Sequence, residues 1–94
     1  MSNPKLLFRV HALQRMFERN VSVKRVRWAI QYGETIEDYS AEMSEPGRLI
    51  LGLQGIRPLH VVASENPGTG EITVITVYIP DDDKWSKDFK VRRA

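Results

Sequence analysis

The chain has 94 residues, of which 41% are hydrophobic and 28% are charged. These proportions are typical of a soluble globular protein, and the length predicts a single domain over residues 1–94. There is no cysteine, which excludes disulfide bonds, thiolate metal sites and cysteine nucleophiles. No stretch approaches the roughly 18 consecutive apolar residues of a membrane span, and the first residues lack the apolar core of a secretory signal. We therefore predict a cytoplasmic protein with no membrane association.

The net charge of +2 is unevenly distributed along the chain. Residues 1–33 carry seven Lys or Arg and one Glu, whereas residues 34–47 carry five acids and no base. Residues 48–94 are close to neutral. A basic helical segment is able to present a face that attracts polyanions such as RNA. An ordinary solvated helix surface is the alternative, and the sequence does not separate the two.

The first third of the chain predicts two helices. Apolar residues at helical spacing predict the buried face of the first helix: Leu6, Val10, Leu13 and Phe17. Asn20 is a suitable left-handed terminator for this helix. Ser22 is a candidate N-cap for the second helix, and Gly33 ends it as a C′ residue. The predicted buried stripe of the second helix consists of Val23, Val26 and Ile30.

From Glu34 onward the pattern is that of strands, predicted over residues 35–39, 48–53, 58–64 and 72–79. The first is polar and suits a sheet edge, and a loop with a Pro46-Gly47 turn follows it. The predicted strands 48–53 and 58–64 flank Gln54-Gly55-Ile56, which indicates a hairpin. The fold class is therefore α+β, with two N-terminal helices followed by a four-stranded antiparallel sheet. Because the last strands are apolar on both faces, we expect a second cover opposite the helices: the tail through Trp85 and Phe89, a partner, or a cleft.

A basic row on the first helix is a candidate phosphate site. His11, Arg15 and Arg19 are four residues apart, so they lie on successive turns of one helix face. Guanidinium groups bind phosphate oxygens in a bidentate manner. The alternative is a solvated face in which Glu18 neutralises the arginines, and the sequence alone favours this alternative.

His60 is a candidate for acid–base chemistry because it interrupts an apolar strand. If the turn that follows centres near Pro67-Gly68, His60 lies across from Ile75 or Thr76, with Tyr78 diagonal to it on the same face. An imidazole beside a phenol is able to act as general acid and base near neutral pH. The alternative is a structural histidine bonded to a carbonyl or a carboxylate, which the sequence favours slightly.

The second helix carries Lys24, Arg25 and Arg27 around Trp28. Basic residues beside an aromatic ring are able to stack a nucleic-acid base or to bind an acidic partner helix. Equally, Trp28 covers the edge of the core, which is the more frequent outcome for tryptophan. The run Asp81–Asp83 has no histidine or further acid at ligand spacing, so it predicts a capped turn rather than a metal site. No cofactor motif is present, and we predict none.

Several segments together resemble a bacterial family catalogued as domain of unknown function 4258: His11–Arg19, Gly33-Glu34, Tyr39, Arg48-Leu49, Pro58–Val62 and Ile75–Tyr78. The resemblance extends over roughly residues 8–92. In its helices followed by an antiparallel sheet, that family is similar to small RelE- and BrnT-like ribonuclease toxins. The resemblance implies metal-independent RNA cleavage at the positions that match the motif, namely His11, Arg15, Arg19, His60 and Tyr78.

Two main hypotheses of function follow. The first is a metal-independent endoribonuclease of toxin type, with His11, His60, Tyr78 and Arg15 in the catalytic site and Arg19, Arg48, Lys24 and Arg25 binding the substrate. The second is a non-catalytic module that binds a protein or a nucleic acid through its edge strand or its Trp28 face. RNA and a small antitoxin-like protein are the expected partners. A third hypothesis is a homodimer that covers the open sheet face.

Overall fold

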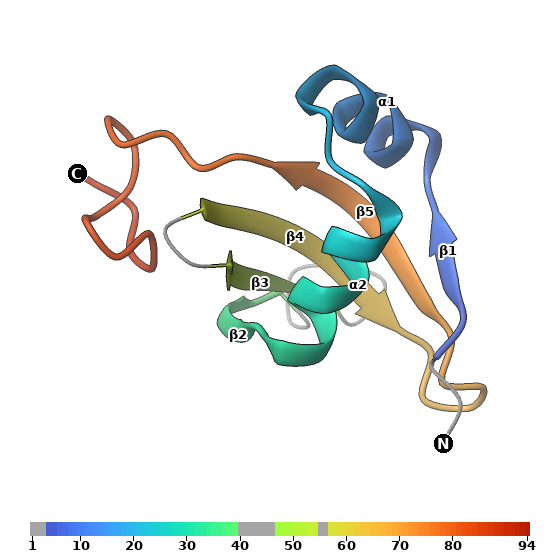
Figure 1. Cartoon of the computed structure of the whole chain (residues 1–94). Helices are drawn as coiled ribbons and strands as arrows, with labels where there is room; N and C mark the ends of the chain where they lie inside the picture. The colour runs from blue at the N-terminus through green and yellow to red at the C-terminus, as the bar shows by residue number, and fades with distance from the viewer. Residues whose placement is uncertain (1–3, 40–46, 55–56) are drawn as a thin grey trace.

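The computed structural model describes residues 4–39, 47–54 and 57–94, and it shows a sheet with two helices on one face (Figure 1). The elements in chain order are β1 (Leu6–Phe8), α1 (Val10–Arg19), α2 (Val23–Tyr32), β2 (Glu34–Asp38), β3 (Gly47–Gln54), β4 (Arg57–Glu65) and β5 (Ile72–Tyr78). The strand order in the sheet is β1-β5-β4-β3-β2, with β1 parallel to β5 and every other pair antiparallel. The predicted α+β class is confirmed.

The predicted four-stranded, fully antiparallel sheet is wrong at one edge, because the sheet has five strands and is mixed. Residues Leu6–Phe8 form β1 and pair in parallel with residues 72–74 of β5. Leu6 and Phe8 pack against the core, whereas Leu7 between them is 41% exposed, which is the alternation of a strand. Three residues are too few for this alternation to stand out from helical spacing, so Leu6 was assigned to the helix.

The buried side of α1 also differs from the predicted one. Ala12 and Met16 are the buried residues of this helix, whereas Val10, Leu13 and Phe17 are 70%, 46% and 89% exposed. α1 packs on β5, and the small side chain of Ala12 allows a close approach. The most apolar side of the helix therefore faces solvent.

The predicted helix ends are largely confirmed. Asn20 ends α1 in the left-handed conformation (φ 56°, ψ 44°). The hydroxyl oxygen of Ser22 caps α2 by accepting from the backbone N–H of Arg25 at 3.1 Å. Gly33 ends α2, but with an extended backbone (φ −77°, ψ 178°) rather than as a left-handed C′ residue. Glycine is needed there for space, since a Cβ would lie 2.6 Å from the carbonyl oxygen of Leu51.

α2 rests directly on β3. Val26 and Ala29 are its buried residues, while Val23 from the predicted stripe is 47% exposed and Ile30 is half-buried. The stripe is displaced because Ala29 approaches β3 at Gly52, where a Cβ would lie 2.9 Å from the Ala29 Cα. Each helix has ten residues, and within the described parts of the chain no helix is long and apolar enough to cross a membrane.

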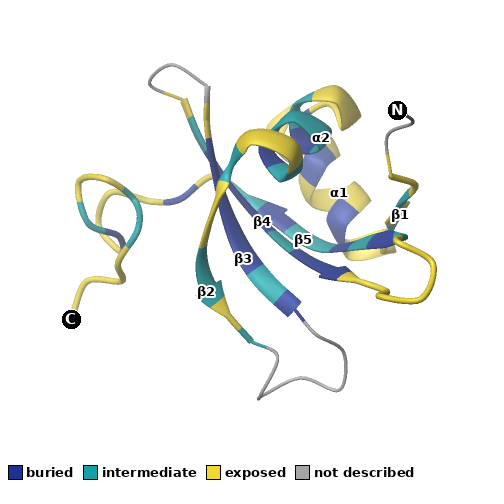
Figure 2. Ribbon diagram, turned by 90° about the horizontal axis from the view of Figure 1, so that it is seen from below, coloured by how far each residue is buried: buried dark blue, intermediate teal, exposed yellow. Residues whose placement is uncertain are grey.

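The two faces of the sheet are covered by different parts of the chain. The helix-facing core contains Ile50, Leu59, Val61, Ala63, Ile72, Val74 and Val77. The C-terminal segment, residues 79–94, lies on the other side of the sheet from the helices (Figure 2). Its Trp85 is only 3% exposed. The tail is thus the second cover that the apolar strands predicted.

The β4–β5 register differs from the predicted one. His60 pairs directly with Tyr78 rather than with Ile75 or Thr76. The connecting turn extends as far as Gly70, whose N–H donates to Asn66, and the register shifts between Val62 and Ala63. Both features move the partner of His60 towards the end of β5.

The predicted turns lie partly outside the described residues. Of the predicted loop at 41–47, only Gly47 belongs to the described residues. Residues 55 and 56 of the first hairpin turn also lie outside them. The pairing of Gln54 with Arg57 nevertheless confirms that β3 and β4 form a hairpin. β2 is an edge strand, as its polar sequence predicted.

Candidate functional site

The residues predicted for one catalytic site lie on both faces of the sheet. His11, Arg15 and Arg19 are exposed on α1, which packs on the helix-facing core that contains Leu59 and Val61. Because strand side chains alternate, His60 between these two residues points to the opposite face. His11 and His60 therefore do not share a site. Arg48 is also apart from them, at the start of β3, where it forms an ion pair of 3.9 Å with Glu65.

His60 and Tyr78 are brought together, and they are buried under the C-terminal segment. His60 is 0% exposed, and its Nδ1 lies 3.2 Å from the hydroxyl oxygen of Tyr78. Its Nε2 lies 2.9 Å from the carbonyl oxygen of Phe89. Because a carbonyl only accepts, Nε2 carries the hydrogen, so the Nδ1 of a neutral ring accepts from the Tyr78 hydroxyl. Trp85 packs edge-on against the imidazole, with ring centroids 4.4 Å apart.

Arg92 holds the C-terminal segment to the sheet edge. Its guanidinium lies over the ring of Trp85, 4.6 Å from the centroid. The same group donates to both carboxylate oxygens of Glu37 on β2, at 3.2 and 3.3 Å, and to the hydroxyl of Tyr39 at 3.3 Å. Tyr39 in turn donates to Glu37. Arg92 therefore links the cover over His60 to the far strand of the sheet.

The pKa shifts in this cluster follow from burial and from these bonds. Burial lowers the pKa of His60 below its usual value, against smaller opposing effects of the Phe89 carbonyl and Glu37. Burial likewise raises the pKa of Tyr78. Burial also acts to raise the pKa of Glu37, but hydrogen bonds from Tyr39 and Arg92 outweigh it and leave that pKa lowered. Burial thus favours the neutral form of His60, and both of its ring nitrogens have hydrogen-bond partners, which is the arrangement of a structural histidine.

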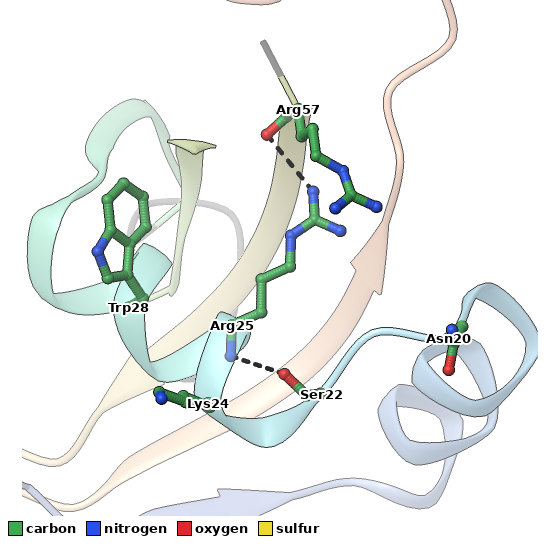
Figure 3. A pocket seen from close by; sticks show the side chains of 6 residues that line it. All are labelled: Asn20, Ser22, Lys24, Arg25, Trp28 and Arg57. Carbon is green, nitrogen blue, oxygen red and sulfur yellow. Dashed lines mark hydrogen bonds between the residues drawn. The ribbon is translucent and has the colours of Figure 1, made fainter. Parts of the chain in front are cut away.

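A second group of predicted residues lines an open pocket at the start of α2 (Figure 3). We call it the basic pocket; it has a volume of about 420 Å³ and is lined by Asn20, Ser22, Lys24, Arg25, Trp28 and Arg57. Arg25 reaches from α2 to the start of β4, where its guanidinium donates to the carbonyls of Arg57 and Pro58 at 3.4 and 3.3 Å. The guanidinium groups of Arg25 and Arg57 lie beside each other in Figure 3.

The basic pocket concentrates positive charge. Three of the six described residues that line it are cations, and none of these six is an acid. Burial lowers the pKa of Arg25, and the nearby charge of Arg57 lowers it further. Two like charges held side by side repel each other, and a bound anion relieves that repulsion. The pocket therefore has the electrostatics of an anion site.

A model of a protein family, described as Domain of unknown function (DUF4258), matches residues 8–79. The chain belongs to this family. No curated protein and no solved structure matches the chain.

The DUF4258 match covers the basic pocket and both His60 and Tyr78, but it ends before the residues that cover His60. Trp85, Phe89 and Arg92 all lie beyond residue 79. In this DUF4258 protein the second cover of the sheet is therefore contributed by residues outside the matched segment.

The sequence reasoning missed three residues of these two sites. Arg57 had no signal, because its place beside Arg25 depends on how α2 packs across β4. Glu37 and Arg92 are 55 residues apart in sequence, and each resembles an ordinary surface charge on its own. The sequence pointed to this cluster through the predicted proximity of His60 and Tyr78 and through the expected cover by the Trp85 tail, but neither signal involves Glu37 or Arg92.

Proposed function

We propose that this DUF4258 protein binds single-stranded RNA through the basic pocket. The observation that carries the proposal is the pair of adjacent guanidinium groups of Arg25 and Arg57 in an open pocket, where no acid is among the lining residues that the structure describes. Phosphate groups suit paired guanidinium groups, because their oxygens accept parallel hydrogen bonds.

Aromatic rings beside the cations favour RNA over a simple anion. Trp28 lines the pocket, and Tyr32 lies one helical turn further along, with ring centroids 5.6 Å apart. Tyr32 is 66% exposed. Unpaired bases stack on such rings while the cations bind the backbone, which is the usual basis of single-strand binding.

The test is a titration of a fluorescently labelled oligoribonucleotide, followed by anisotropy at several salt concentrations. The double variant Arg25→Gln with Arg57→Gln is expected to bind about tenfold or more weakly, with a shallower dependence on salt. Trp28→Ala is expected to weaken binding by a similar factor through lost stacking. Lys84→Gln with Lys87→Gln is the matched control, since it removes two charges from exposed positions of the C-terminal segment. Equal affinities for the two double variants would end the proposal.

A second function, metal-independent cleavage of RNA, is favoured by the hydrogen bond between His60 and Tyr78. With the C-terminal segment displaced, His60 would accept the proton of the attacking 2′-hydroxyl, and Tyr78 would donate one to the leaving oxygen. RNA incubated with the protein in EDTA should then be cleaved faster by Arg92→Ala than by the wild type, and not by His60→Gln. Intact RNA with all three proteins rules this function out.

A further inference from the structure

α1 exposes a continuous apolar row, which we call the α1 apolar face and which consists of Val10, Leu13 and Phe17. These side chains are 70%, 46% and 89% exposed. They are three and four residues apart, so they lie together on one side of the helix. A single exposed apolar side chain is ordinary, whereas a row of large ones marks an interaction surface.

A hollow accompanies this row. It has a volume of about 590 Å³ and is lined by Val10, Leu13, Gln14, Phe17 and Glu18. Three of these five side chains are apolar, and the two polar ones come from the flank of the helix nearest to the basic row. All five residues belong to α1, so the hollow is a shallow, open stretch of the helix surface, and it suits the apolar side of a partner helix packed against α1.

The charges beside the α1 apolar face favour an acidic partner. His11, Arg15 and Arg19 follow the helix on the flank beyond Glu18, and all three are exposed. Glu18 is the one acid of α1, and it lies 3.7 Å from Arg15, which leaves an excess of positive charge along the helix. A second copy of this chain would bring the same arginines to the contact, and like charges oppose such a pairing.

We propose that the α1 apolar face docks an acidic amphipathic helix of another protein. The apolar side of the partner, at positions i, i+3, i+4 and i+7, packs on Val10, Leu13 and Phe17. Its flanking glutamates or aspartates face His11, Arg15 and Arg19. This surface and the basic pocket have no lining residue in common, so the inference is independent of RNA binding.

Two synthetic helical peptides test the proposal. Both carry the same leucines on one face; one has glutamates and the other has lysines at the remaining positions. The glutamate peptide is expected to bind the wild-type protein at least tenfold more tightly than the lysine peptide, with amide NMR shifts concentrated in residues 10–19. Leu13→Ser with Phe17→Ser should weaken binding of the glutamate peptide at least tenfold. Tyr32→Ser, which changes an exposed aromatic residue of α2 instead, should leave it unchanged.

Because both altered side chains of the double variant are exposed, its thermal midpoint should stay near that of the wild type. Equal binding of the two peptides overturns the proposed partner chemistry. Unchanged binding by the double variant overturns the proposed surface. Sedimentation that shows a wild-type dimer, dissociated by Leu13→Ser with Phe17→Ser, assigns the face to a second copy and overturns the proposal as well.

Discussion

His60 and Tyr78 stand directly opposite each other on neighbouring strands, and the Nδ1 of His60 lies 3.2 Å from the Tyr78 hydroxyl oxygen. The second ring nitrogen bonds to the backbone of Phe89 in the tail. One imidazole thus joins β4, β5 and the C-terminal segment. A buried polar group with every bond satisfied contributes to stability, and it becomes costly when one partner is removed.

His60→Gln should therefore destabilise the fold, by about 2 kcal/mol in the free energy of unfolding. The amide replaces at most one of the two hydrogen bonds and loses the edge-on contact with Trp85. Urea unfolding followed by circular dichroism measures the change. His11→Gln is the matched control: it makes the same substitution on an exposed helix position, with an expected effect within about 0.5 kcal/mol. Equal midpoints for the two variants would show that His60 is not structural.

Stability should also depend on pH through His60. Its pKa is lowered in the folded state by burial, so between that pKa and about 6.5 the unfolded chain binds more protons than the folded one. The contribution is fully present above about pH 6.5 and is lost as the pH falls towards the folded-state pKa, with a slope of at most about 1.4 kcal/mol per pH unit. Unfolding free energies between pH 7.5 and 5.5 measure it, in a range that lies above about 4.3, the usual pKa of a glutamate such as Glu37. His60→Gln should remove the slope, and a slope retained in that variant would assign the effect to other groups.

Features that depend on one or two neighbouring residues could be predicted from the sequence. Asn20 adopts the left-handed conformation with little strain, and the Ser22 hydroxyl reaches the N–H of Arg25 within the same turn. β5 was identified from its β-branched residues, and the polar composition of β2 matched an edge. These signals belong to the residues themselves, so tertiary packing did not change them.

Features that depend on packing between distant segments could not be predicted. The spacing of its apolar residues predicted that the most apolar side of α1 is buried. Instead, Ala12 packs closely on the sheet, and Phe17 therefore faces solvent. The register of β4 and β5 at His60 depends on the shift between Val62 and Ala63, and no residue type in the sequence predicts this shift. The basic pocket was half predicted, since Arg25 was named for its own helix, whereas Arg57 is placed beside it only by the fold.

Arg92→Gln should loosen the C-terminal segment without unfolding the sheet. The guanidinium contacts Trp85 and Glu37 from a position where its side chain is 59% exposed. Because solvent screens such contacts, the expected cost is only about 1 kcal/mol. Hydrogen exchange at the tail amides of Phe89 and Arg93, which donate to Ser86 and Lys84, should speed up roughly fivefold. Lys87→Gln removes one charge from the same segment and should leave these rates unchanged; similar acceleration in both variants would reject the role of Arg92.

Gly52→Ala should destabilise the contact between α2 and β3 by about 2 kcal/mol. The new Cβ would meet the backbone of Ala29, with its Cα at 2.9 Å, so the helix must move off the sheet. Gly68→Ala is the control, because its Cβ would meet only the side-chain oxygen of Asn66, at 3.3 Å in an exposed turn. Adding Ala29→Gly to Gly52→Ala creates space on the other side of the contact, so the double variant should unfold at higher urea than the sum of the two single effects predicts. If the changes in unfolding free energy of the two single variants simply add in the double variant, residues 29 and 52 are not in close contact, and other contacts position α2.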